Sequence, residues 1–252
     1  MTPTTPRTSP DAPAHLVKPT FVLVHGAFRG GWAWTGVRSA LAAAGTRSLA
    51  PTLTGCEPDS PRVGTRVWLQ EWVDDVIKAI TQAAELGDGV ILVAHSQAGL
   101  PVRAALEQLA AQVHHVVYLD AAVPENGERG VDLNPPGVAR PPDDLDPALW
   151  LPPRPVGIDH GFTDPAIAAF VNERLVPTPV GPSLDPVMLT SELAATVPAT
   201  YVFFSQTPAT YPCRLTQTRL QQSGTAYQTL EAGHDAPLTD ADDVVDLLLA
   251  VN

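Results

Sequence analysis

The segment VILVAHSQAG, residues 90–99, decides the fold class of this chain. Its first five residues are apolar or small and predict a buried strand, and residues 99–112 follow at once with the apolar spacing of a helix. Ser96 stands on the turn between the two, where small neighbours leave room for a strained backbone. This pattern is typical of a nucleophilic serine on a strand-to-helix turn. A serine that only caps a helix N-terminus is the alternative.

Composition is that of a globular protein and argues against several kinds of partner. The 252 residues fit one α/β domain with an insertion, and 44% of them are hydrophobic. The net charge of −12 argues against nucleic acid or a membrane surface as partner, because both attract clustered Lys and Arg. Cys56 and Cys213 are far apart and give no metal or disulfide framework. We therefore expect reduced thiols in a cytoplasmic protein that acts on a small molecule without metal or cofactor.

Residues 1–19, MTPTTPRTSPDAPAHLVKP, differ from the rest of the chain. They are rich in Pro and Thr and contain no apolar core of the kind that signal peptides have, so they predict a disordered tail. Elsewhere no apolar run approaches the roughly 18 residues that are needed to span a bilayer.

Beyond this tail, apolar runs alternate with segments of helical period, which predicts a doubly wound, mostly parallel α/β sheet. The expected strands are 20–26, 47–51, 90–95, 113–120, 199–205 and 225–231. The expected helices are 32–45, 66–86, 99–112 and 239–251. In such a sheet, functional residues gather at the carboxyl ends of the strands.

Residues 124–198 break this alternation and hold fifteen prolines. Two helices are expected within them, 164–175 with Pro165 at its first position, and 185–193. An insertion of this length between core strands is typically a lid over the site, and a flexible surface excursion is the alternative. The expected organisation is a tail over 1–19, an α/β core over 20–123 and 199–252, and a lid over 124–198.

A serine nucleophile needs a base, and His234 is the best candidate among the histidines. It follows the last expected strand in the loop EAGHDAP, 231–237, from which a base reaches a serine on a neighbouring turn. A loop histidine in solvent is the alternative. The other histidines lie in the tail, at strand ends, beside the serine or in the insertion: His15, His25, His95, His114, His115 and His160.

A carboxylate that orients the imidazole is expected at Asp120. The strand over 199–205 cannot be followed by one, because no acidic residue lies between positions 192 and 231. Asp235 adjoins the histidine and would have to fold back on its neighbour. Asp120 ends the strand after the serine turn and can approach the same histidine. Glu125 is the reserve candidate, and a capping role for Asp120 in the next turn is the alternative.

The glycine-rich loop HGAFRGGW, 25–32, predicts one side of an oxyanion hole, because its glycines let the backbone pass close to a substrate. An oxyanion needs two backbone N–H donors, and the residue after the serine, Gln97, supplies one. Ala27 is the expected second donor, with Phe28 next in order. The side chain of Phe28 then lines the pocket. Arg29 either steers an anionic group or is a solvated loop arginine.

Aromatic residues around these loops and in the insertion predict a bulky apolar substrate. The candidates for substrate contact are Phe28, Trp150, His160 and Phe162, to which Trp32 and Trp34 add apolar surface. Each aromatic side chain equally fits the protein core.

Five blocks of the sequence, taken together, resemble the α/β-hydrolase superfamily. They are VLVHGAFRGGWAW, APTLTGCEPD, LVAHSQAGL, VVYLDAAVPENG and EAGHDAP. More narrowly they are similar to small bacterial esterases related to plant methyl-ester esterases and hydroxynitrile lyases. The blocks stand in family order, with the serine before a final histidine, and the resemblance covers nearly all of residues 20–251.

The resemblance implies the α/β-hydrolase fold and a Ser–His–acid triad of Ser96, His234 and Asp120, with Ala27 and Gln97 as the oxyanion hole. The chain departs from the family pattern at positions 94 and 98, where alanine replaces the usual glycine. It also departs at TGCEPDSP, 54–61, where many relatives continue with another glycine and a charged helix start.

The expected function is hydrolysis of a carboxylic ester or lactone of a bulky apolar small molecule through an acyl-enzyme. A non-hydrolytic cyclase or proton-transfer enzyme of natural-product biosynthesis, with the serine idle, is the alternative, and a binding protein with a relic triad is a third. A hydroxynitrile lyase would carry a lysine near the histidine, yet no lysine follows Lys78. Epoxide hydrolases and dehalogenases need an aspartate where Ser96 stands.

Overall fold

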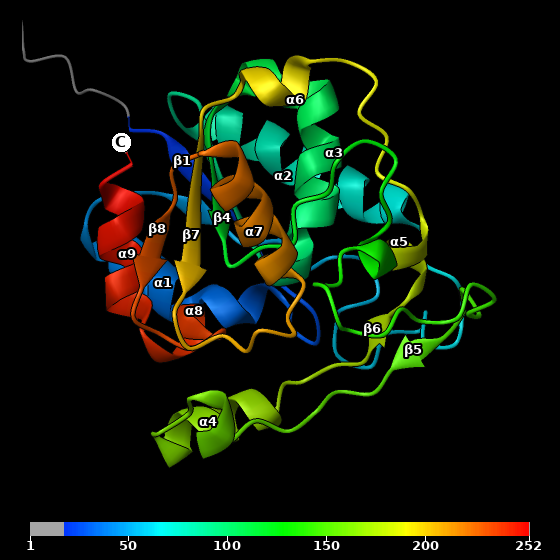
Figure 1. Cartoon of the computed structure of the whole chain (residues 1–252). Coiled ribbons are helices and arrows are strands. Elements are labelled where there is room, and N and C mark those ends of the chain that lie inside the picture. Colours follow the sequence, from blue (N-terminus) through cyan, green and yellow to red (C-terminus); the bar gives the residue numbers. More distant parts are fainter. Residues whose placement is uncertain (1–17, 252) are drawn as a thin grey trace, which may run out of the picture.

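The computed structural model describes residues 18–251, so all but the last two positions of the predicted tail lie outside the described residues. Within this range six parallel strands form one sheet in the order β2-β1-β3-β4-β7-β8 (Figure 1). The strands are β1 Thr20–Val24, β2 Ser48–Leu49, β3 Val90–His95, β4 Val113–Leu119, β7 Ala199–Phe204 and β8 Gln228–Leu230. The predicted doubly wound sheet is confirmed.

Helices connect the strands, four of them at the predicted positions, whereas the helices over 213–223 and 236–239 are not among the predicted ones. The core helices are α1 Thr35–Ala43, α2 Leu69–Leu86, α3 Gly99–Leu109, α7 Cys213–Ser223, α8 Ala236–Thr239 and α9 Ala241–Leu249. Short 3-10 turns adjoin them at η1 Gly31–Trp34, η2 Ser96–Ala98 and η3 Ala110–Gln112. The expected helix 66–86 begins only at Leu69, because Glu71 caps it by accepting the Trp68 backbone N–H at 2.9 Å. No helix within residues 18–251 has the length and apolarity to cross a membrane.

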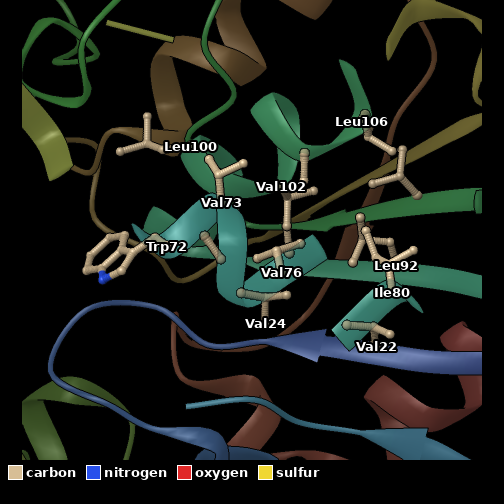
Figure 2. Packing of buried hydrophobic residues seen from close by; sticks show 14 of the residues in the cluster. Val22, Val24, Trp72, Val73, Val76, Ile80, Leu92, Leu100, Val102 and Leu106 are labelled. Carbon is tan, nitrogen blue, oxygen red and sulfur yellow. The ribbon is translucent and has the colours of Figure 1, made fainter. Parts of the chain in front are cut away.

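Alternate residues of the central strands face two separate cores, as the period of two in a strand dictates. Val22 and Val24 of β1 pack on the side of α2 and α3, where Figure 2 shows them beside Val76. Phe21 and Leu23 belong to the opposite core, under α1 and α9. Full burial of one such side chain contributes about 1.5–3 kcal/mol, so these two cores hold the strand ends of the site in place.

The insertion over 124–198 consists of short elements and long loops. They are η4 Gly130–Asp132, β5 Trp150–Leu151, η5 Ile158–His160, α4 Pro165–Asn172, β6 Thr178–Pro179, α5 Gly181–Leu184 and α6 Leu193–Thr196. Strands β5 and β6 pair antiparallel, and the chain between them, with α4, projects away from the sheet (Figure 1). The helix predicted over 164–175 is confirmed, because Asp164 caps α4 by accepting the Ala166 N–H at 2.8 Å.

The helix predicted over 185–193 is wrong. Residues 185–192 run without helix between α5 and α6. Pro186 disfavours helical backbone at Asp185, whose ψ is 137°. The backbone bonds of Val187 go to another loop, since its N–H donates to Glu128 O at 2.8 Å and its carbonyl accepts the Gly127 N–H at 2.8 Å. The apolar spacing that predicted a helix buries Val187 from an extended segment instead.

Close packing holds the turn between β3 and α3 against the end of β4. The Ala122 N–H donates to the Ser96 carbonyl at 3.0 Å. A Cβ at Gly99 would lie 2.0 Å from the Ala122 carbonyl oxygen, far inside contact distance. Only glycine fits at this position without moving one of the two loops.

Gly99→Ala should therefore lower the free energy of unfolding by about 3 kcal/mol or more, because the added methyl overpacks a rigid turn. Urea denaturation followed by circular dichroism measures the loss. Gly157→Ala is the matched control, since its Cβ would stand 3.4 Å from the Asp159 carboxylate in ordinary contact. Equal stability of the two variants would contradict the close packing.

Candidate active site

Ser96 lies at the carboxyl end of β3 with its backbone at φ 56°. This left-handed conformation costs a residue other than glycine about 1–3 kcal/mol, so the surroundings must impose it. The first loop passes directly over the serine, where a Cβ at Gly26 would lie 2.8 Å from the Ser96 Cβ. The structure thus places Ser96 on the sharp, crowded turn that the sequence predicts.

His234 bridges Ser96 and Asp120. Its Nε2 lies 2.9 Å from Ser96 Oγ and its Nδ1 lies 2.6 Å from Asp120 Oδ2. An ionised carboxylate can only accept, so the Nδ1–H donates to Asp120 and Nε2 is left to accept the serine hydroxyl. The three residues that the sequence singled out are therefore brought together, from the ends of β3 and β4 and from the loop after β8.

Asp120 is fully buried, with 0% exposure. Burial pushes the pKa of this carboxyl upward, but hydrogen bonds to His234, Thr207 and the Phe204 N–H, together with the His234 charge, outweigh it. The pKa therefore lies below its ordinary value. The Thr207 hydroxyl donates to Oδ2 at 2.5 Å, and the Phe204 N–H donates to Oδ1 at 3.2 Å. The site thus holds an ionised acid behind the histidine at neutral pH.

The other two acidic candidates have different partners. The side chain of Glu125 is 72% exposed and lies 3.9 Å from Arg219. Asp235 accepts from Arg29 Nη2, with both carboxylate oxygens at 3.1 Å. This ion pair is largely buried, so Arg29 is not the solvated arginine that the sequence allowed. The ion pair joins the glycine-rich loop, 25–32, to the histidine loop, residues 231–237, which carries His234.

Two further histidines are buried beside the site, and burial lowers the pKa of both His25 and His95 to about 4. Both are neutral at pH 7. The His95 Nε2–H donates to the His234 carbonyl at 2.8 Å. His25 bonds the Gly26 carbonyl through Nδ1 at 2.8 Å and accepts the Leu53 N–H at 3.1 Å. They fix the backbone of the two loops that face Ser96.

The backbone donors expected to stabilise an oxyanion differ in their partners. Phe28 donates its N–H to Thr178 Oγ1 at 2.6 Å, so it is already engaged. The Ala27 N–H bonds no acceptor among residues 18–251, which favours Ala27 over Phe28. Gln97 lies in the first turn of η2, where a backbone N–H has no earlier carbonyl in the helix to bond. Its side-chain amide donates to Ser183 Oγ at 2.8 Å.

The predicted substrate contacts are spread over the insertion, and their role stays a prediction. His160 is exposed, and its carbonyl approaches Gly233 in the histidine loop. Phe162 is 1% exposed. Trp150 donates its Nε1–H to the Thr65 carbonyl at 2.9 Å, and its ring borders Gly55 in the loop that departs from the family pattern. Trp34 is a core residue.

An apolar pocket of about 320 Å³ lies between the insertion and the core. Trp32 meets Phe170 of α4 edge-on there, with ring centroids 5.9 Å apart. Pro237 and Leu238 of α8 complete its wall. The pocket borders the chain just after His234 but does not include the triad.

Sequence reasoning missed the contribution of the loop after β7, residues 205–212. It expected an acid there and found none, yet Thr207 supplies a hydroxyl to Asp120. Tyr211 lies edge-on to the imidazole of His234, with centroids 4.6 Å apart. The position of this loop at a carboxyl strand end was the available signal.

Cys213, at the start of α7, lies with Asp120 and His234 in a group whose ligand atoms are within 4.8 Å of one another. Two ligands on one zinc ion stand about 3.4 Å apart, from bonds of about 2.1 Å in tetrahedral geometry. Asp120 and His234 are 2.6 Å apart, which suits a shared proton better than a metal ion. Burial, followed by the Asp120 charge, raises the pKa of Cys213 and keeps it a neutral thiol.

The Alpha/beta hydrolase family model matches residues 21–247, and the chain belongs to this family. A carbendazim hydrolyzing esterase of Nocardioides sp. (strain SG-4G) is 43% identical over 115 residues, 46% of this chain and 47% of that protein. Esterase PIR7B of Oryza sativa subsp. japonica is 36% identical over 107 residues, 42% of this chain and 40% of that protein. The chain thus spans less than half the length of these curated relatives.

Solved structures resemble the whole fold. The methylesterase MES16 from Arabidopsis superposes with a TM-score of 0.73 over 93% of this chain and 98% of its own, at 22% identity. A mutant of tomato Methylketone Synthase I gives 0.72 over the same shares, at 17% identity. At such identities the likeness shows the fold alone.

We expect stability to fall as the pH drops from about 6.5 towards 4. His25 and His95 titrate near 4 when folded and near 6.5 in an ordinary environment, so the unfolded chain binds more protons in this window. Each pKa shift contributes up to about 3 kcal/mol to the free energy of unfolding, and this contribution is fully present above pH 6.5. Urea unfolding at pH 7.5 and pH 5 measures the loss. His25→Gln should flatten the pH dependence, and an unchanged slope in that variant would refute the assignment.

Proposed function

We propose that the chain hydrolyses a carboxylic ester or lactone of a bulky apolar small molecule through an acyl-enzyme on Ser96. The observation that carries this proposal is the unbroken hydrogen-bonded line from Ser96 Oγ through His234 to the buried Asp120. A serine hydroxyl becomes a useful nucleophile when a neighbouring base removes its proton, and this line supplies the base and its orienting acid.

In the proposed first half-reaction, Ser96 Oγ attacks the ester carbonyl carbon while His234 Nε2 takes the hydroxyl proton. The tetrahedral intermediate collapses, the bond to the alcohol oxygen breaks, and the protonated His234 returns that proton to the leaving alkoxide. In the second half, His234 removes a proton from water, the hydroxide oxygen attacks the acyl carbon, and Ser96 leaves with its proton restored. Asp120 stays ionised and stabilises the imidazolium in both halves.

The negative oxygen of each tetrahedral intermediate is proposed to lie between the backbone N–H groups of Ala27 and Gln97. Such donors act where charge develops in the transition state and typically contribute a factor of about 10²–10³ in kcat each. The unbonded state of the Ala27 N–H supports this assignment, since an engaged donor would have to give up its partner first.

The comparisons support an ester as the substrate class. Two relatives that match this chain over more than 100 residues are named esterases, one of them for carbendazim hydrolysis. Phe28, Trp150, His160 and Phe162 are the proposed substrate contacts, with the insertion acting as a lid. An apolar acyl or alcohol group is the proposed ligand of that lid, because aromatic side chains dominate this set.

Ser96→Ala should abolish covalent labelling by a fluorophosphonate probe and reduce p-nitrophenyl acetate turnover to background, because it removes the nucleophile. Intact-protein mass spectrometry and absorbance assays read the two effects. Ser223→Ala is the control, since Ser223 is an exposed serine at the end of α7. A wild-type protein that takes no label and turns over no ester would contradict the hydrolase proposal. Proton-transfer chemistry with an idle serine would then be favoured.

Asp120→Asn should lower kcat on the order of 10⁴-fold, because asparagine cannot hold the imidazole in the tautomer that accepts the serine proton. Glu125→Gln is the matched control and should keep wild-type kcat, since Glu125 is exposed and lies beside Arg219. Steady-state kinetics on p-nitrophenyl acetate measure both variants. Near-normal activity of Asp120→Asn would remove Asp120 from the triad.

A further inference from the structure

Phe28 has a backbone conformation that needs support from elsewhere. Its φ of 63° is left-handed, which a bulky residue adopts only when other contacts impose it. Both backbone polar groups of Phe28 bond to the insertion: the N–H donates to Thr178 Oγ1 at 2.6 Å, and the carbonyl accepts the Val176 N–H at 3.2 Å. The insertion, rather than the sheet, therefore holds this residue.

Thr178 is a rigid support for that bond. It stands between Pro177 and Pro179, whose rings restrict the backbone on both sides to extended conformations. Its β-branched side chain is stiff at χ1, and the residue is 3% exposed. Pairing with Leu151 in the β5–β6 ribbon fixes its position along the chain.

The same short segment reaches the other side of the site. Ser183 of α5, five residues beyond Thr178, accepts the side-chain amide of Gln97 at 2.8 Å. The segment over 178–183 thus contacts Gln97, one residue beyond Ser96, and Phe28, one residue beyond Ala27. The segment over 178–183 therefore lies next to both residues that are proposed to donate to the oxyanion, Ala27 and Gln97.

We infer that Thr178 is a positioning residue that holds the oxyanion loop, residues 25–31, in its active geometry. The inference rests on the proposed function. Without the Thr178 hydroxyl, the partly buried Phe28 N–H loses its acceptor, and Phe28 leaves the left-handed conformation to find another. Ala27 precedes Phe28 directly, so its N–H moves away from the position where the oxyanion develops. Such a loss acts in the transition state and lowers kcat rather than raising KM.

Thr178→Val tests the inference, because valine keeps the shape and the branching and removes only the acceptor. We expect kcat for p-nitrophenyl acetate to fall about tenfold or more, with KM within twofold of wild type. Thr178→Ser keeps the hydroxyl and should stay within threefold of wild-type kcat. Thr163→Val, at an exposed threonine of the same insertion, should match wild type.

Hydrogen–deuterium exchange of a peptide covering residues 25–31 supplies a readout that does not depend on turnover. Exchange should be faster in Thr178→Val and unchanged in Thr178→Ser and Thr163→Val. If valine disturbs folding, as judged by the melting temperature, Thr178→Ala takes its place, with the same expected fall in kcat and the same faster exchange. Unchanged exchange in the variants without the hydroxyl, or equal kcat losses in the valine and serine variants, would overturn the inference.

The two proposals fail in different ways. A wild-type protein that neither turns over ester nor takes a label at Ser96 would contradict the proposed hydrolysis, while exchange of the oxyanion loop would still decide whether Thr178 holds it. Normal wild-type turnover with full activity and unchanged exchange in Thr178→Val would leave the hydrolase in place and remove Thr178 from its support.

Discussion

A carboxylate with no solvent exposure, Asp120, is the constraint on which the arrangement of the site depends. A buried charge costs several kcal/mol unless hydrogen bonds surround it, and here these come from three groups on two segments of the chain. The Phe204 N–H comes from the end of β7, the Thr207 hydroxyl from the loop that follows, and the imidazole from the loop after β8. Satisfying one charge thus draws three strand ends together around Ser96.

Much of this could be predicted from the sequence, because buried parallel strands leave continuous apolar runs and the absence of acids between positions 192 and 231 directs the search to Asp120. The ion pair of Arg29 with Asp235 and the bond from Phe28 to Thr178 could not, since they join residues about 150 to 200 positions apart. No local pattern encodes such pairs. The segment 185–193 was misjudged because nine residues with apolar positions fit an extended path as well as a helix.

Support for the site comes from two sources of different character. The sheet and its two cores set the positions of β3, β4, β7 and β8, and the core on the side of α2 and α3 also includes buried insertion residues such as Val187 and Ala194. The insertion also contacts the loops of the site, through Thr178 to Phe28 and through Ser183 to Gln97. The strained backbone of Ser96 is held by close packing, whereas that of Phe28 is held by its hydrogen bonds to the insertion.

The insertion is itself divided. Its β6–α5 part is bonded to the loops beside Ser96, whereas the excursion that carries α4 meets Trp32 beside an apolar pocket and approaches the histidine loop at Gly233. Thr178 and Ser183, whose hydroxyls contact the loops of the site, lie outside that excursion. Under the proposed lid role, the excursion is the part that evolution or an engineer can vary to admit a new ligand, and the β6–α5 part is the one that must stay constant for any ligand to react.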